Sequence, residues 1–222
     1  MLIAEIGLNH QGDILKAKQL IAEAHLSGAD IVKSQAVPKG FSNSMPKEFY
    51  EQCMFSIPEM IELIYYARSI GTDLFYSIFH SDYNCLNYHQ KWHKHSASQS
   101  RIGIPENIDS ETMIISIPSD VPPKMLSRAK VLFVNDYLAE ETDLYMIDEY
   151  RYYYHDRVGF SDHSIGPEVS LIAVKEFNVQ YLEKHFILDR DKEKIKYNGK
   201  LFRDSIHSCT PKELSQIARG MK

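Results

Sequence analysis

Short apolar segments recur along the chain, and amphipathic or polar stretches separate them. Eight of these segments have the length of a β-strand, and they cover residues 2–7, 30–35, 73–79, 92–96, 113–117, 130–135, 157–160 and 179–186. Between the first two segments, residues 14–26 are predicted to form a helix because their apolar positions recur at helical spacing. Gly28 follows that helix as a stop signal.

The same periodicity, with proline and glycine signals, predicts further helices. Pro58 opens one at residues 59–70, residues 167–177 form another, and Pro211 begins the last. Strands that alternate with helices pair in parallel. Eight such strands predict an α/β protein with a closed TIM (β/α)₈ barrel, formed by residues 1–222 as a single domain.

The predicted helical layer is thin in one half of the barrel. Residues 99–112 contain Pro105 and little helical periodicity, and residues 118–129 leave room for barely two turns. Because a full barrel takes about 250 residues, this chain predicts a shortened barrel with reduced helices between strands 4 and 6. Uncovered apolar strand faces mark interfaces. We therefore expect a homo-oligomer, most simply a homodimer, with residues 152–154 as a further contributor.

Composition and charge exclude several classes of protein. The chain is 44% apolar and 25% charged, as in ordinary soluble proteins. Its 25 Lys and Arg against 30 Asp and Glu give a net charge of −5, which excludes a general nucleic-acid binder. No apolar run reaches the roughly 18 residues of a membrane span, and because the first residues read as a strand we expect no signal peptide. Three widely spaced cysteines without a metal-type spacing favour a reduced, cytoplasmic compartment.

Charged residues interrupt several predicted strands, although both faces of a parallel barrel strand are covered and favour apolar residues. These residues are Glu5, Lys33, Lys94, Glu183 and Lys184. An unpaired ion there costs several kcal/mol, so the charges must meet each other, a ligand or a metal. Structural ion pairs that fill the barrel remain one interpretation. A functional site is favoured because the polar residues gather toward the carboxyl ends of the strands.

Two histidines end neighbouring predicted strands, each beside a carboxylate. His163 follows Asp162 at the seventh strand, and Glu183 and His185 share one face of the eighth. Adjacent strands place both imidazoles within reach of one divalent ion, with oxygen ligands or water completing its shell. The sequence therefore predicts a metal site at His163 and His185.

Three other features favour structural roles. If Lys94 points into the barrel, His93 and His95 point outward, where hydration explains them better than a second metal. Cys209 has no paired base in its motif and is not expected to act as a nucleophile. The carboxylates at residues 189, 191 and 193 lie among lysines and predict a solvated loop.

Five motifs are spaced along nearly the whole chain. They read IAEIGLNHQG at residues 3–12, GADIVKSQ at 28–35, GFSDHS at 159–164, LEKHF at 182–186, and Asp204 followed by SCTPKEL at 208–214. In this order they resemble the motifs of the sialic acid synthase family, whose enzymes condense phosphoenolpyruvate with an N-acylated sugar. The agreement is too extensive for chance.

The resemblance implies roles for individual residues. It implies that His163 and His185 hold a divalent ion, usually Mn²⁺ with Mg²⁺ or Co²⁺ as alternatives, which polarises the aldehyde of the sugar. It implies that Glu5, His185 and Asp204 are catalytic, Glu5 beside the reacting carbons and Asp204 at the sugar. The residues implied in binding phosphoenolpyruvate are Lys33, Lys94, Ser116, Asn135, Tyr137 and Ser161. A trianion needs such cations and hydroxyl donors.

The sequence also departs from the family pattern. Residues 77–80 stand where the family has Ser-Thr-Pro-Phe, so one hydroxyl is missing there. Ala97 and Gln99 replace a serine and a carboxylate. The motif that ends at Pro118 has lost another hydroxyl. An amide such as Gln99 cannot act as a base. The family's C-terminal antifreeze-like domain, which carries an arginine for the acyl group, has no counterpart in these residues. A separate polypeptide is a candidate source of that domain.

Two functions therefore stay open. The first is a transferase that condenses phosphoenolpyruvate with an aldehyde sugar to give a nonulosonic, sialic-acid-like 2-keto-3-deoxy acid and phosphate. The second is a diverged barrel that keeps the metal site but acts as a different aldolase-like enzyme or as a non-catalytic sugar- or phosphate-binding partner. The retained charged residues and histidines favour the first, and the lost hydroxyls, carboxylate and acyl-recognising domain favour the second.

Overall fold

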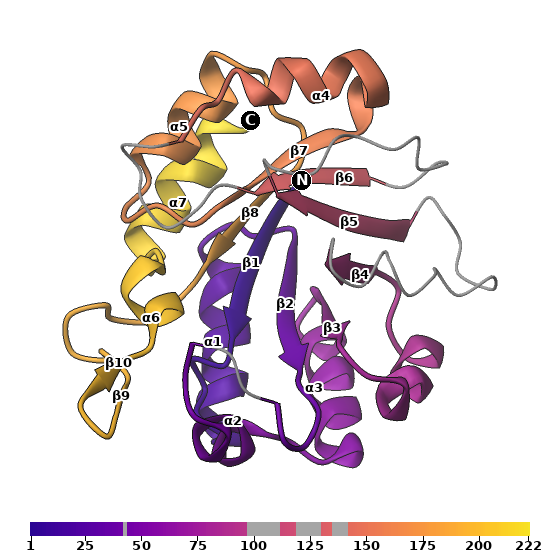
Figure 1. The fold of residues 1–222 in the computed structure, drawn as a ribbon, viewed down its shortest axis with the longest axis vertical. Coiled ribbons are helices and arrows are strands. Elements are labelled where there is room, and N and C mark those ends of the chain that lie inside the picture. Colours follow the sequence, from indigo (N-terminus) through magenta and orange to yellow (C-terminus); the bar gives the residue numbers. More distant parts are fainter. Residues whose placement is uncertain (42–43, 97–111, 119–129, 135–141) are drawn as a thin grey trace.

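Eight parallel strands close into a barrel in sequence order, from β1 to β8 (Figure 1). The structure of the protein, a computed structural model, describes residues 1–41, 44–96, 112–118, 130–134 and 142–222. The strands are β1 (Leu2–Gly7), β2 (Ile31–Ala36), β3 (Asp73–Ile78), β4 (His93–Ser96), β5 (Met113–Pro118), β6 (Lys130–Val134), β7 (Val158–Asp162) and β8 (Leu182–His185). The α/β TIM-barrel prediction is confirmed, with most strand ends within two residues of their predicted positions.

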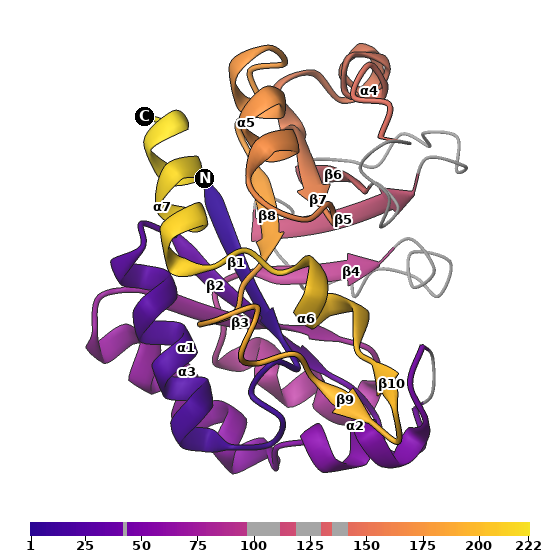
Figure 2. The same cartoon turned by 90° about the vertical axis from the view of Figure 1, so that its left-hand side faces the viewer.

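Helices pack on the outside of the barrel (Figure 2). Those predicted from sequence are α1 (Ile14–Leu26), α3 (Ile57–Ser69), α5 (Glu168–Lys175) and α7 (Pro211–Gly220). Those not predicted are α2 (Lys47–Cys53), the 3₁₀ helices η1 (Ser81–Tyr88) and η4 (His155–Arg157), α4 (Met146–Tyr154), α6 (Arg203–His207) and a hairpin of β9 (Lys196–Tyr197) and β10 (Lys200–Leu201). Within the described ranges, none of the helices is both long and apolar enough to cross a membrane.

Local signals explain where the predicted helices begin. The Asp13 carboxylate accepts hydrogen bonds from the first backbone N–H groups of α1. Ser56 and Glu59 form a reciprocal capping box at the start of α3. A second capping box, formed by Thr210 and Glu213, opens α7.

The barrel interior has an apolar floor and a polar upper layer. The floor consists of Ile3, Ile31, Phe75, Ile114 and Leu132, all buried. Two residues further along four of these strands, the same face carries a polar residue, whereas β6 carries Val134, because side chains alternate with period two. Gly159 belongs to the floor on β7, where a Cβ atom would lie 2.3 Å from the Tyr181 backbone oxygen.

The outward faces of β5 and β6 are covered within the single chain. Met113, Ile115, Val131 and Phe133 are each at most 2% exposed, and the ring of Phe133 stacks on that of Tyr150 from α4 at 5.9 Å. The expectation that these faces lie bare is therefore wrong. The segments at 97–111 and 119–129, where reduced helices were expected, lie outside the described residues.

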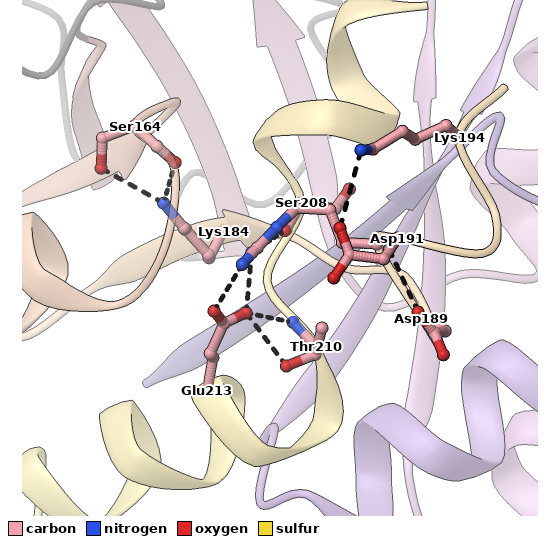
Figure 3. Close-up of polar contacts among 9 residues, drawn as sticks. Ser164, Lys184, Asp189, Asp191, Lys194, Ser208, Thr210 and Glu213 are labelled. Carbon is pink, nitrogen blue, oxygen red and sulfur yellow. Dashed lines mark hydrogen bonds and ion pairs between the residues drawn. The ribbon is translucent and has the colours of Figure 1, made fainter. Parts of the chain in front are cut away.

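The outer surface of β8 carries a buried ion pair that holds the loop after β7. Lys184 is fully buried, and its Nζ atom lies 2.9 Å from the Asp162 carboxylate. It also donates to the backbone oxygen of Ser164 at 2.5 Å (Figure 3). His163 lies between these two anchored residues, so the ion pair positions it from outside the barrel.

The loop after β8 is held in turn by Arg190. Its guanidinium donates to both carboxylate oxygens of Glu213, at 2.8 and 2.9 Å, and to the backbone oxygen of Ser208. Figure 3 shows Glu213 also joined to Thr210. The carboxylates of residues 189 and 191 form exposed pairs with nearby lysines, as expected of a solvated loop. For Glu193 that expectation is wrong, because its half-buried side chain pairs with Lys16 of α1.

Candidate active site

A cavity of about 180 Å³ lies at the carboxyl ends of the barrel strands. Seven of the residues predicted from sequence line it: Glu5, Lys33, Lys94, Ser116, Ser161, His163 and His185. Gln35, Ser77, Phe79, Val134 and Glu183 complete the lining. All eight strands, or the residues directly after them, therefore contribute to one polar chamber above the apolar floor.

Glu183 is the centre of the charged cluster in this cavity. One of its oxygens, Oε1, lies 2.9 Å from the Lys33 Nζ atom and 2.5 Å from the Lys94 Nζ atom. Ser161 donates a hydrogen bond to the same oxygen at 3.0 Å. Lys33 forms a second ion pair with Glu5, and Glu5 also accepts from the backbone N–H of Gly7 at 2.6 Å.

Burial and the charges of the two lysines shift the pKa values of the groups in this cluster. Burial raises the pKa of Glu5 to about 7, against the opposing effect of Lys33. Burial lowers the pKa of Lys94 to about 8, although Glu183 opposes this shift. For Glu183, the two lysines outweigh burial and hold its pKa far below the usual value. The cavity thus holds a permanent carboxylate and, at Glu5, a carboxyl that exchanges a proton near neutral pH.

The two histidines lie side by side at the edge of the cavity. The ring centroids of His163 and His185 are 5.2 Å apart. Burial lowers the pKa of each to about 3, with the neighbouring His185 adding to the effect on His163 and Lys33 to the effect on His185. Both imidazoles are therefore neutral at pH 7, the form in which a histidine binds a metal.

These residues fit a divalent metal ion. The buried Nδ1 atom of His185 has no hydrogen-bond partner among the described residues, so its lone pair is available to a ligand. Within the same residues, no group of three or more His, Cys, Asp or Glu side chains is arranged to hold a metal. An ion held by two imidazoles would take its remaining ligands from water or substrate oxygen atoms.

A second cavity of about 250 Å³ adjoins the first. The two share Gln35, Phe79, His163 and His185 as lining residues. Asp204, predicted from sequence, lines this second cavity from α6, and Ser208 donates to its backbone oxygen at 2.6 Å. The structure thus places Asp204 across the histidine pair from the lysine cluster.

Some sequence predictions fall elsewhere. Asn135, Tyr137 and Gln99 lie outside the described residues. The prediction that hydration explains His93 is wrong: its side chain points outward but is buried, and its Nδ1 atom lies 3.0 Å from the Asn87 side-chain oxygen. Cys209 is buried, and burial raises the pKa of its thiol to about 12. This agrees with the expectation that it is not a nucleophile.

Two residues of the site were missing from the predicted set. Glu183 was recognised as an inward charge, yet nothing in the local sequence indicates that it bridges two lysines from β2 and β4. Gln35 lines both cavities. The sequence did indicate Gln35, because the strand period of two places it on the same strand face as Lys33.

Comparisons with known proteins find similarity to proteins named as sialic acid synthases. Residues 136–222 match the model of the NeuB family. N-acetylneuraminate-9-phosphate synthase from Mus musculus is 26% identical, and the alignment covers 100% of this chain and 69% of the mouse protein. The Homo sapiens protein of the same name is 25% identical with the same coverage.

Solved structures share the fold. N-acetylneuraminic acid synthetase from Leptospira borgpetersenii serovar Hardjo-bovis, in complex with citrate, superposes with a TM-score of 0.79 at 23% identity, covering 99% of this chain and 81% of that one. The spore coat polysaccharide biosynthesis protein spsE from Bacillus subtilis gives a TM-score of 0.70 at 22% identity, covering 100% and 66%.

Proposed function

Since this chain carries the barrel of the NeuB, or sialic acid synthase, family, we propose that it condenses phosphoenolpyruvate with the aldehyde of an N-acylated hexosamine. The product is a nonulosonic, sialic-acid-like 2-keto-3-deoxy acid. One observation carries the proposal: two lysines, Lys33 and Lys94, and two hydroxyls, Ser116 and Ser161, line one cavity beside a pair of neutral histidines.

The reaction balances without an oxidant or reductant. The methylene carbon of phosphoenolpyruvate bonds to the aldehyde carbon, and the aldehyde oxygen takes a proton to become a hydroxyl. Water adds to the former enol carbon, the bond from that carbon to the phosphate oxygen breaks, and phosphate leaves. The remaining oxygen becomes the keto group of the product.

The lysines and hydroxyls suit the anionic substrate. Lys33 and Lys94 supply buried positive charge, which binds phosphate and carboxylate strongly because water is excluded. Ser116 supports this role, since its buried Oγ atom has no hydrogen-bond partner among the described residues. Glu5 can take up or release a proton near neutral pH, as its raised pKa of about 7 allows.

His163 and His185 would hold the divalent ion, with Mn²⁺ as the first candidate. When bound, such an ion supplies Lewis-acid polarisation of a carbonyl oxygen. Asp204 would then hydrogen-bond a sugar hydroxyl from the opposite side of the second cavity. This arrangement presents the aldehyde to the cavity that holds phosphoenolpyruvate.

One observation favours the alternative function. Glu183 and Glu5 already form ion pairs with both lysines, so the cluster is close to neutral without any ligand. A barrel with such internal pairs is stable as a non-catalytic sugar- or phosphate-binding protein, or as a different aldolase-like enzyme. The two functions differ in whether phosphoenolpyruvate is consumed.

Phosphate release distinguishes them. The full chain is incubated with phosphoenolpyruvate and Mn²⁺, and with a panel of N-acyl and neutral sugars, while phosphate is measured and the product is identified by mass. Release that requires both metal and an N-acyl sugar is expected, and Lys94→Met should abolish it. Binding of phosphoenolpyruvate without release for any sugar contradicts the synthase and supports the alternative.

A further inference from the structure

The short helix α6 brings Asp204 to the second cavity, and its own sequence cannot hold it there. The helix has five residues, and its N-cap residue is Phe202, whose side chain cannot accept a hydrogen bond from the first turn. A helix of this length is unstable on its own, because nucleation fixes several residues before hydrogen bonds repay the cost. Tertiary contacts must therefore set the position of Asp204.

Asn9, which follows β1, makes two of these contacts. Its side chain is fully buried. The amide nitrogen donates to the backbone oxygen of Phe186 at 2.8 Å and to the hydroxyl of Ser208 at 2.9 Å. The Oδ1 atom has no hydrogen-bond partner among the described residues, so the two donor bonds fix the orientation of the amide. They link the loop after β1 to the end of β8 and to the end of α6.

Ser208 connects Asn9 to Asp204. It is the C-cap residue of α6 and is fully buried (Figure 3). Its hydroxyl accepts from Asn9 and donates to the backbone oxygen of Asp204 at 2.6 Å. Arg190 donates to the backbone oxygen of the same serine at 3.0 Å. The hydroxyl thus joins Asn9 to the backbone of the residue that lines the second cavity.

The other bond of Asn9 reaches the strand that carries His185. Phe186 directly follows that histidine, and its backbone N–H donates to the Glu5 backbone oxygen at 2.8 Å. The backbone N–H of Cys209 donates to the His185 backbone oxygen at 2.7 Å. Asn9 therefore lies where β1, the end of β8 and the segment after α6 meet.

The placement of Asp204 relative to the histidine pair depends on this junction. Both histidines and Asp204 line the second cavity. Burial and the neighbouring His185 lower the pKa of His163 to about 3, and the charge of Asp204 opposes this shift, so the carboxylate lies near the imidazoles. A displacement of α6 would move Asp204 away from a ligand held at the histidines. Misplacement of a substrate by about 1 Å can reduce a rate roughly 100-fold.

We propose that Asn9 is a positioning residue, which through Ser208 fixes Asp204 relative to His185 so that both act on the same sugar. This inference rests on the proposed function and deepens it. The chemistry of the junction requires an amide, because both partners of Asn9 accept hydrogen bonds from a single nitrogen. An aspartate or a leucine of similar size donates none.

Two variants break the link at different points. Ser208→Ala deletes the hydroxyl and leaves the bond from Asn9 to Phe186 in place. We expect it to raise the KM for the N-acyl sugar about tenfold, the equivalent of one hydrogen bond, with the KM for phosphoenolpyruvate and the Mn²⁺ affinity unchanged. Asn9→Leu removes both bonds, and it should weaken the binding of the sugar and of Mn²⁺ together.

Controls separate positioning from folding. Ser208→Thr keeps the hydroxyl and should restore the wild-type KM for the sugar. Thr72→Val is the matched control, since it removes a buried hydroxyl that donates to the Asp30 backbone oxygen at the amino end of β3, away from the cavity. It should change neither KM. The melting temperature is measured for every variant. A rise in the sugar KM that also appears in Thr72→Val would overturn the inference.

A double-mutant cycle tests whether Ser208 acts through Asp204. Asp204→Ala should raise the KM for the sugar by itself. Adding Ser208→Ala to that variant should raise the KM little further, because the group that Ser208 positions is already missing. Additive effects would show that Ser208 acts independently of Asp204, and the inference would then be wrong.

Hydrogen exchange makes the inference independent of turnover. The backbone amides of residues 203–209 should exchange faster in Ser208→Ala and Asn9→Leu than in the wild-type chain, and at wild-type rates in Thr72→Val. If this occurs while no sugar supports phosphate release, the positioning stands and the proposed function fails. If phosphate release occurs and neither exchange nor KM changes, the positioning is wrong and the proposed function stands. Faster exchange with an unchanged KM for a sugar that turns over would show a purely structural link, which also overturns the inference.

Discussion

The Nζ atom of Lys94 on β4 lies 2.5 Å from the Oε1 atom of Glu183 on β8, across the interior of the barrel. The same oxygen contacts Lys33 and Ser161, so one carboxylate organises groups from three other strands. The cluster can serve either as a structural centre or as a preformed site whose lysines turn to a substrate anion. Variants that remove one charge at a time separate these roles.

Replacing Lys33 by methionine should weaken phosphoenolpyruvate binding more than it weakens the fold. A charge-assisted hydrogen bond contributes about 1.5–3 kcal/mol, so we expect the affinity to fall roughly 10- to 150-fold. Glu183 keeps Lys94 and Ser161 as partners in this variant, which limits the loss of stability. Calorimetric titration measures the affinity, and thermal unfolding measures the stability.

The control for this variant is Lys212→Met, which removes an exposed lysine from α7. It should alter neither quantity. If Lys33→Met instead lowers the melting temperature sharply while the folded fraction binds phosphoenolpyruvate as before, the lysine is a structural filler of the barrel.

Metal binding should depend on both histidines at the cavity edge. His163→Ala and His185→Ala should each weaken Mn²⁺ binding at least tenfold, and the double variant should abolish it, because imidazole nitrogens are the protein ligands proposed here. Titration with Mn²⁺ followed by electron paramagnetic resonance gives the affinity directly. His89→Ala, at the end of η1 beside Tyr65, is the matched control. Unchanged Mn²⁺ affinity in the double variant would place the metal elsewhere.

Strand periodicity explains why so much of the site could be predicted. Ile31, Lys33 and Gln35 alternate with outward residues along β2, so an apolar floor and a polar layer follow from the order of the residues. The histidines were found because each ends a strand. Parallel strands bring their carboxyl ends to one rim of the barrel, whatever their distance in sequence.

Other parts of the structure depend on contacts that the local sequence does not encode. Glu183 meets Lys94 only because the barrel closes, and no periodicity predicts which inward charges become neighbours. The helix α2 has seven residues and belongs to an aromatic cluster completed by residues 195–202. Short helices of this kind are stabilised by tertiary packing rather than by propensity.

The pair between Glu213 and Arg190 should make stability depend on pH. Although burial opposes it, Arg190 and the Thr210 N–H hold the pKa of Glu213 below its ordinary value of 4.5. The stabilisation is therefore complete above about pH 4.5 and is lost as the pH falls through the lower, folded-state pKa. Glu213→Gln keeps a capping side chain but removes the charge.

We expect that variant to lose about 1 kcal/mol of unfolding free energy at pH 7, because the pair is partly exposed to solvent. The difference from wild type should shrink below pH 4.5. Urea unfolding at pH 7 and pH 4 measures it. A difference that grows as the pH falls would contradict the assignment.

Self-association needs a surface other than the outer strand faces, because those faces are buried. The rings of Tyr152 and Tyr153 on α4 are 80% and 42% exposed, whereas Tyr154 is buried. We expect a homodimer that uses these two rings. Size-exclusion chromatography with light scattering should then give twice 25.7 kDa at micromolar concentration. Tyr152→Ser should shift it toward the monomer and Tyr88→Ser should not. A wild-type mass of 25.7 kDa would reject the dimer.

Gly159 should be essential to the barrel for a steric reason. A Cβ atom at this position would lie 2.3 Å from the Tyr181 oxygen, 2.5 Å from its Cβ atom and 2.7 Å from the Leu132 side chain. The first contact is with backbone, which cannot move without disturbing the pairing of β7 with β8. Overpacking of this kind costs about 1–3 kcal/mol and occasionally more, so Gly159→Ala should lower the unfolding free energy by at least that amount.

In Gly220→Ala, the added methyl meets only the flexible Leu171 side chain, at 3.1 Å, and α7 gains a better helix former. Urea unfolding measures the free energy of unfolding of both variants. Equal values would show that the backbone around Gly159 shifts to accept the added methyl group.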